Sequence, residues 1–326
     1  MSRSIKVTSL LALAGLCAQA QGQPEFLVSD FSGNRVVRFK YPSGKAFDHF
    51  VGQGISPLDD AGYMAIGPDQ KLYVSSYSTH SILRYDGVTG EFLGEFVTPG
   101  DGLGRPGQFA WGPDGHLYVC SWDNSSVLMY NGQSGVFKKI FISKGKGGLD
   151  GAWGLVFEDD GNLLVASSEN DKVLRFDSGG NFVKEIPVAH TGLNQPRRLI
   201  RDSAGTVYVT GLSSDSVIAI DAQDSARVFV SGGLGGLDQP SGMAFDPDGN
   251  LLVCSMGGDG TVLKYDGSFG QYLGYIIVGT DGGMSGNPSD ILFLPQPEEC
   301  GPDYDGNGLL DLFDFLAFVN AFNAGC

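Results

Sequence analysis

The 326-residue sequence predicts an all-β fold, a six-bladed β-propeller, followed by a short C-terminal module. Three observations lead to this prediction. One unit recurs along the chain at a nearly constant spacing, each unit holds four short strand patterns, and the two incomplete units at the ends complement each other. The 50 glycines are spread along the chain rather than clustered, as many tight turns require.

Five complete units begin at positions separated by 45, 46, 44 and 44 residues. In each unit the first strand ends in a turn of the Pro-Asp-Gly type, and the second has the form Leu-Tyr-Val-x-Ser. A polar loop leads to a third strand, and a fourth strand carries aromatic residues. Four strands per repeat of this length are typical of a propeller blade. The units begin at Met64, Phe109, Leu155, Leu199 and Met243.

The two ends of the repeat region are expected to form the sixth blade together. Residues 25–51 contain a second, third and fourth strand but no first strand, whereas residues 288–295 resemble a first strand with nothing after it. Residues 291–294 should therefore pair with the strand that begins at Glu25, which closes the ring and removes free sheet edges. A small residue after the valine of each second strand should pack against a neighbouring blade. These residues are Ser29, Ser75, Cys120, Ala166, Thr210 and Cys254.

The N-terminus and the charge indicate an exported, acidic protein. Arg3 and Lys6 precede an apolar stretch, residues 7–16, that is too short to span a bilayer, and Ala18-Gln19-Ala20 has the form of a cleavage site. Residues 1–20 are therefore predicted to be a signal peptide, with an N-terminal hydrophobic strand as the alternative. No later segment is long and apolar enough to cross a membrane, so we expect a secreted or cell-surface location. The net charge of −16 argues against nucleic acid and anionic membranes as partners.

Two stretches carry a resemblance to known propeller families. LVSDFSGNRVVRF, residues 27–39, resembles the NHL-repeat consensus, in which an Asp follows the second strand and Asn-Arg-Val opens the third. FDPDGNLLV, residues 245–253, is similar to the gluconolactonase-like six-bladed propellers. The resemblance covers residues 25–295. It implies either a propeller that binds a ligand or a protein, or a hydrolase or lyase of the lactonase type acting in the central channel.

The lactonase resemblance implies a divalent metal in the channel, held by an Asn that opens a first strand and an Asp that follows a second strand. Ser241 and Ser289 stand at the Asn position, and Asp30 is the only acid among the residues that follow the second strands. The amidating-lyase type of propeller uses clustered histidines for zinc, but His80 and His116 occupy non-equivalent positions. We therefore expect a binding function and keep a lactonase-type enzyme as the alternative.

The opening residues of the first strands should line one mouth of the channel, because these strands begin near the propeller axis. Trp153 and the adjacent Arg197 and Arg198 are unusual there and could hold an anionic or sugar-like ligand through bidentate hydrogen bonds and stacking. The alternative is that Arg198 pairs with Asp290 and plugs the channel. The candidate ligand-binding residues are Tyr63, Gln108, Trp153, Arg197, Arg198 and Asp290.

The C-terminal segment carries a regular pattern of oxygen ligands. DYDGNGLLDLFD, residues 303–314, has the spacing of an EF-hand-type calcium loop, with Gly308 at the sharp turn. Carboxylates at this density repel one another unless a cation lies among them, so we expect bound Ca²⁺ rather than a solvated acidic tail. The predicted ligands are Asp303, Asp305, Asn307, the carbonyl of Leu309, Asp311 and Asp314.

This loop resembles the calcium repeat of dockerins, since it lacks a preceding helix and ends in Asp. The sequences FDFLAF and NAGC are similar to the Gly-Cys-ending dockerin-type anchors of exported planctomycete proteins. The resemblance covers residues 300–326 and implies a cell-surface anchoring partner, although a full dockerin has two such loops. Cys300 and Cys326 flank the module, so a disulfide is expected in an exported chain. The predicted domains are residues 1–20, 21–296 and 297–326.

Overall fold

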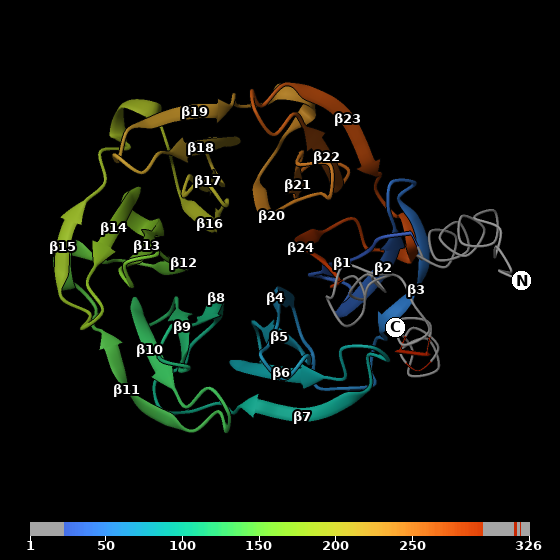
Figure 1. The fold of residues 1–326 in the computed structure, drawn as a ribbon, viewed down its shortest axis with the longest axis horizontal. Coiled ribbons are helices and arrows are strands. Elements are labelled where there is room, and N and C mark those ends of the chain that lie inside the picture. The colour runs from blue at the N-terminus through green and yellow to red at the C-terminus, as the bar shows by residue number, and fades with distance from the viewer. Residues whose placement is uncertain (1–22, 296–315, 318–319, 321–326) are drawn as a thin grey trace, which may run out of the picture. The chain divides into compact units, whose positions relative to one another are not determined.

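The computed structural model describes residues 23–295 together with Leu316, Ala317 and Asn320. Within it, Glu25–Phe293 form a ring of six four-stranded sheets, which confirms the predicted all-β six-bladed propeller (Figure 1). The predicted signal peptide, the calcium ligands between positions 303 and 314, and the Cys300–Cys326 disulfide lie outside the described residues. No helix in the described part of the chain has the length and apolar character needed to cross a membrane.

Each blade runs from a strand near the axis to a strand at the outer rim (Figure 1). Blade 1 contains β24 (Pro288–Phe293), β1 (Glu25–Asp30), β2 (Arg35–Lys40) and β3 (Lys45–Val51). Blade 2 contains β4 (Ala61–Ile66), β5 (Leu72–Ser76), β6 (Ser81–Tyr85) and β7 (Phe92–Val97), and blade 3 contains β8 (Pro106–Trp111), β9 (Leu117–Ser121), β10 (Ser126–Tyr130) and β11 (Phe137–Ile142). Blade 4 contains β12 (Ala152–Phe157), β13 (Leu163–Ser167), β14 (Lys172–Phe176) and β15 (Phe182–Glu185). Blade 5 contains β16 (Pro196–Arg201), β17 (Val207–Gly211), β18 (Ser216–Ile220) and β19 (Ala226–Val230), and blade 6 contains β20 (Pro240–Phe245), β21 (Leu251–Ser255), β22 (Thr261–Tyr265) and β23 (Tyr272–Ile277).

Short 3₁₀ turns accompany the strands. They are η1 (Lys146–Gly148), η2 (Ser168–Asn170), η3 (Ala189–Thr191), η4 (Leu234–Gly236) and η5 (Asp281–Gly283).

The ring is closed by the strand pairing that the sequence predicts. β24 pairs antiparallel with β1, with Phe26 opposite Phe293 and Val28 opposite Ile291. The last strand of the repeat region therefore completes the sheet that the first strand begins, and blade 1 has four strands like every other blade. Closure in this way leaves neither end of the repeat region with an unpaired inner edge.

The hydrophobic core lies between neighbouring blades, and the second strands contribute most of it. β5, β9, β13, β17 and β21 are buried at every residue. One cluster shows the arrangement: Tyr73 and Ile82 of blade 2 pack with Phe109 and Val119 of blade 3. Burial of a Val, Leu or Phe side chain contributes about 1.5–3 kcal/mol, so these contacts between sheets hold the ring together.

The small residues after the second-strand valines are all fully buried, as predicted. The hydroxyl of Ser29 donates to the carbonyl of Gly62 in the next blade at 2.7 Å, and that of Thr210 donates to the carbonyl of Ser241 at 3.0 Å. A larger side chain would separate the blades at these points. Cys120 and Cys254 are buried free thiols on β9 and β21, three blades apart.

The innermost strands are interrupted where they approach the axis. In β4, Ala61 pairs with Ser76 and Met64 pairs with Val74, so Gly62 and Tyr63 have no partner on the second strand. The same irregularity occurs in β8, β12, β16 and β20. Because a β-bulge changes the direction in which side chains point, two residues in each of these five blades are freed from the regular alternation of the strand, and in blade 1 Ser289 alone is. These residues supply most of the site described next.

Candidate functional site

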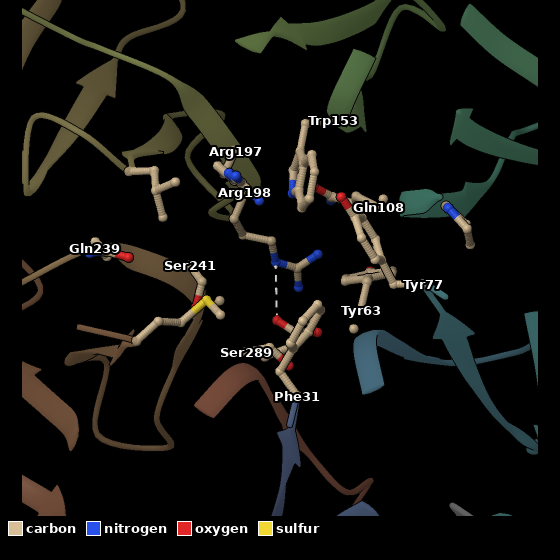
Figure 2. A pocket seen from close by; sticks show the side chains of 17 residues that line it. Phe31, Tyr63, Tyr77, Gln108, Trp153, Arg197, Arg198, Gln239, Ser241 and Ser289 are labelled. Atoms are coloured by element: carbon tan, nitrogen blue, oxygen red, sulfur yellow. Dashed lines mark ion pairs between the residues drawn. The ribbon is translucent and has the colours of Figure 1, made fainter. Parts of the chain in front are cut away.

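A cavity of about 330 Å³ opens at the axis, where the bulged parts of the innermost strands meet. All six candidate ligand-binding residues of the sequence analysis lie in its lining (Figure 2). The volume is within the range of small-molecule pockets. The strands that bring these residues together are β4, β8, β12, β16 and β24.

A second group of lining residues lies outside the six candidates. Phe31, Tyr77, Leu212 and Met256 each directly follow a second strand, and they add apolar and aromatic surface to the pocket. The signal for them is present in the repeat alignment. Large apolar side chains stand at one fixed position, directly after the second strand, in five of the six units; the fifth is Trp122, which lies outside the lining, and Ser168 is the exception.

Arg198 and Asp290 form an ion pair across the axis, as the plugged-channel alternative expects, but the cavity remains open beside them. The Arg198 Nε and the Asp290 Oδ1 are 3.5 Å apart (Figure 2). This geometry is not that of a hydrogen bond: Nε and Nη1 of Arg198 and Oδ1 of Asp290 have no hydrogen-bond partner among the described residues. The other oxygen of Asp290 accepts the backbone N–H of Met64 at 2.9 Å. The pair therefore leaves guanidinium donors unused.

Burial has opposite consequences for the two partners. It raises the pKa of Asp290 to about 6, although Arg198 and the N–H groups of Met64 and Ile291 favour the carboxylate. Burial alone would lower the pKa of Arg198, but Asp290 and Tyr63 beside it raise that pKa above its usual value. The guanidinium also lies over the ring of Tyr63, 4.1 Å from the centroid. Arg198 is thus a fixed cation, whereas Asp290 can exchange a proton near neutral pH.

Arg197 has no carboxylate partner among the described residues. Its guanidinium lies 3.5 Å from the ring centroid of Trp153, and its Nε has no hydrogen-bond partner there either. Burial lowers the pKa of Arg197 to about 10, with Tyr77 and Glu169 only partly offsetting the effect. The two guanidinium groups therefore face one carboxylate, that of Asp290, which pairs with Arg198 alone, and the pocket carries excess positive charge in a protein whose net charge is −16.

Close backbone approaches fix these side chains in place. The amide of Gln108 spans the channel to the backbone of Leu199, donating to its carbonyl at 2.8 Å and accepting its N–H at 3.0 Å. A Cβ on Gly154 would lie 1.9 Å from the carbonyl oxygen of Arg197. Only glycine allows β12 and β16 to approach this closely, so the backbone that carries both arginines is held rigidly.

Aromatic rings extend from the pocket along its rim. The ring centroids of Phe31 and Tyr77 are 5.6 Å apart, and those of Tyr77 and Trp153 are 5.7 Å apart. Trp122 continues the series at 5.9 Å from Trp153, and its indole N–H donates to Glu169 at 3.2 Å. The arrangement combines fixed positive charge with flat apolar surface beside it.

The residues that a lactonase-type metal site would use are engaged elsewhere. Asp30 is fully buried, accepts the backbone N–H of Ser285 at 2.7 Å and pairs with Arg35 at 3.1 Å. The hydroxyl of Ser289 donates to the carbonyl of Ala61 at 2.5 Å. None of the four histidines lines the pocket. Within the described part of the chain, no group of three or more His, Cys, Asp or Glu side chains is placed to hold a metal ion.

Known proteins share this fold at low sequence identity. A chain of the nidogen/laminin complex is 15% identical, over 83% of this chain and 98% of that one, with a TM-score of 0.65. A protein of unknown function from Bacteroides caccae is 14% identical, over 84% of this chain and 100% of that one, with a TM-score of 0.63. A catalytically inactive virginiamycin B lyase from Staphylococcus aureus, crystallised with quinupristin, is 14% identical over 72% of this chain and 74% of that one, with a TM-score of 0.54.

These likenesses show the fold, which is shared by proteins that bind partners and by a lyase. One family model, described as WD domain, G-beta repeat, matches residues 237–266, a segment that runs from just before β20 to just after β22. This match supports a repeat-type propeller blade without assigning the whole chain to a family. No curated protein matches the sequence.

Proposed function

We propose that the propeller is a binding module that holds an anionic small molecule in its axial pocket. The supporting observation is a pair of partly buried guanidinium groups in which individual nitrogen donors are buried and unused. Arg197 has no acidic partner among the described residues, and Arg198 shares Asp290 in a contact that leaves Nε and Nη1 without hydrogen bonds. Buried donors without partners are costly in native proteins, and a carboxylate or phosphate accepts two guanidinium N–H groups at once.

The binding proposal is favoured over a lactonase-type reaction by the chemistry of the lining. A hydrolase or lyase needs a nucleophile or a general base within hydrogen-bond reach of the substrate. The hydroxyls of Ser241 and Ser289 donate to backbone carbonyls, and Asp290 faces Arg198. The pocket therefore offers positive charge and apolar surface for recognition, with the hydroxyls of Ser241 and Ser289 already bonded to the protein.

The test is calorimetric titration with three carboxylates that differ in their bodies: acetate, glucuronate and benzoate. At least one should bind to the wild-type protein, and Arg198→Met should weaken that binding by about 10-fold or more, since a charged hydrogen bond contributes about 1.5–3 kcal/mol. Arg201→Met is the matched control, because Arg201 lies on the same strand, β16, but pairs with the exposed Asp159. Failure of all three carboxylates to bind would contradict the proposal.

We further propose that the protein is exported and attached through its C-terminal calcium module to a cell-surface partner. The support is the ligand spacing of residues 303–314 and the leader-like pattern of residues 1–20. Metal analysis should find calcium bound to the intact chain and lost from a chain that ends at Glu299. A divalent metal that remains in the shortened protein would instead support the lactonase-type alternative.

A further inference from the structure

Three of the pocket's polar side chains are poorly placed to bind a sugar, because they are already bonded to the protein. Gln108 uses both ends of its amide on the backbone of Leu199, Ser241 donates to the carbonyl of Pro288 at 3.2 Å, and Ser289 donates to that of Ala61. A sugar acid has hydroxyl groups around its whole ring, and each one buried without a partner costs free energy. Gln108, Ser241 and Ser289 would have to break existing hydrogen bonds to serve them, and the exposed Gln239 alone offers a further side-chain amide among the residues that line the pocket.

The remaining surface matches a flat apolar body. Phe31, Tyr77 and Trp153 form a continuous series of rings on one side of the pocket, and Leu212 and Met256 add apolar surface from two other blades. In Figure 2 the Arg198 side chain reaches toward the middle of the space that Phe31, Tyr77 and Trp153 surround. Aromatic rings contribute binding energy to flat apolar ligands through area and through offset or edge-to-face contacts.

The two features come from different elements around one cavity. Arg197 and Arg198 stand on the bulge of β16, next to Leu199, whose backbone Gln108 holds, whereas Phe31 and Tyr77 belong to loops that leave the second strands. A ligand that satisfies both must carry its charge at one end and its apolar ring at the other. The cavity of about 330 Å³ limits that ligand to a small molecule.

We propose that the ligand is an aromatic carboxylate, with its carboxylate on the guanidinium groups of Arg197 and Arg198 and its ring against Phe31, Tyr77 and Trp153. The inference rests on the proposed binding function and adds the chemical class of the ligand. Charge selects the anionic end, and the existing hydrogen bonds of Gln108, Ser241 and Ser289 disfavour a polyhydroxylated body. An aliphatic acid of similar size would keep the ion pair but lose the ring contacts.

The test compares four probes on the intact protein by calorimetry: 2-naphthoate, cyclohexanecarboxylate, glucuronate and the neutral 2-naphthamide. We expect 2-naphthoate to bind at least about 10-fold more tightly than glucuronate, and several-fold more tightly than cyclohexanecarboxylate, because only its ring contacts the aromatic series. The neutral amide should bind at least about 10-fold more weakly than 2-naphthoate, because it cannot pair with the guanidinium groups.

Two variants test where the aromatic ring of the ligand binds. Tyr77→Leu keeps an apolar side chain but removes the flat surface, and should weaken 2-naphthoate by about fivefold while leaving glucuronate unchanged. Tyr272→Leu, on the outer strand β23, is the matched control and should change neither. Unchanged 2-naphthoate binding in Tyr77→Leu would overturn the placement of the ring.

The outcomes separate this inference from the function on which it rests. Glucuronate binding as tightly as 2-naphthoate, with loss in Arg198→Met, would overturn the aromatic class and leave anion binding intact. Binding of the neutral amide as tightly as the acid would overturn both. Absence of binding by every carboxylate would overturn the proposed function itself.

Discussion

The second and the innermost strands of the same six blades follow opposite rules. The second strands repeat almost the same sequence and are buried at every residue from β5 to β21. The innermost strands differ from blade to blade at their bulges, where a glycine stands in one blade and Trp153 or Arg197 stands in another. The residues that repeat in every blade form the propeller ring, whereas the residues that differ between blades form the pocket at the axis.

The difference has an energetic basis. Apolar burial is favourable in any blade, so the same valine and leucine positions serve all six. Removing an arginine from water is unfavourable unless it has a partner, and the pocket contains two partly buried arginines with only one carboxylate. Arginines that destabilise the fold in this way are typical of functional sites. For this reason the axis, and not the outer rim, is the candidate site.

The largest expected effect is a loss of unfolding free energy when a second strand receives a buried charge. Val209→Asp places a charge at a fully buried position of β17 and should cost about 4 kcal/mol or more of unfolding free energy, because the carboxylate has no partner there. Val183→Asp is the control, since Val183 lies on the outer strand β15 and is 47% exposed. Urea denaturation followed by circular dichroism measures both. Equal stability of the two variants would contradict the role given to the second strands.

The next effect is on the packing of the innermost strands. Gly154→Ala should cost about 2–3 kcal/mol, because its Cβ would lie 1.9 Å from the carbonyl oxygen of Arg197 and must displace backbone. Gly52→Ala is the control, since its Cβ would meet no atom closer than 3.8 Å. The same denaturation experiment applies. Carboxylate binding should weaken in Gly154→Ala alone, and a stable variant with unchanged binding would show that this approach does not position the arginines.

A smaller effect is expected on the pH dependence of binding. The pKa of Asp290 is raised to about 6, so lowering the pH from 7.5 to 5 neutralises the carboxylate that competes for Arg198. The other titratable group facing it, Cys254, has a pKa raised well above its usual value and stays neutral. Affinity for an ionised carboxylate should therefore rise about fivefold toward pH 5.

Asp290→Asn sharpens this test. The variant should bind carboxylates more tightly than the wild type at pH 7.5 and lose the pH dependence, because no proton can be taken up. A wild-type affinity that falls between pH 7.5 and 5, or a pH dependence that persists in Asp290→Asn, would contradict competition between Asp290 and the ligand for Arg198.

The smallest expected effect is a gain in stability that accompanies a loss of binding. Burial lowers the pKa of Arg197 to about 10. At every pH below that value the guanidinium is charged, and its charge destabilises the folded protein relative to the unfolded chain. The burial cost of about 3 kcal/mol is offset in part by the contact with Trp153, which contributes about 2 kcal/mol. Arg197→Met should therefore raise the unfolding free energy by about 1 kcal/mol and weaken carboxylate binding, whereas Arg201→Met should do neither. A destabilised Arg197→Met would contradict an unpaired charge.

The ring could be predicted from the sequence because four strands recur at nearly constant spacing and because residues 25–51 lack the first strand that residues 288–295 resemble. The alignment also placed Arg198 and Asp290 at one mouth of the channel, since both open innermost strands. Phe31 and Tyr77 were not predicted, although the alignment shows large apolar side chains at their position, because loop residues carry no strand pattern that indicates where they point. The stacking of Arg197 on Trp153 was not predicted either, because side-chain direction at a bulge no longer follows strand alternation.

The most direct test of the account observes the side chains themselves. In an NMR titration of ¹⁵N-labelled protein with benzoate, the Nε–H resonances of Arg197 and Arg198 should shift and saturate together, while that of Arg201 stays in place. Saturable binding in which neither pocket arginine responds, or a uniform shift of every arginine, would contradict the assignment of the axial pocket as an anion site.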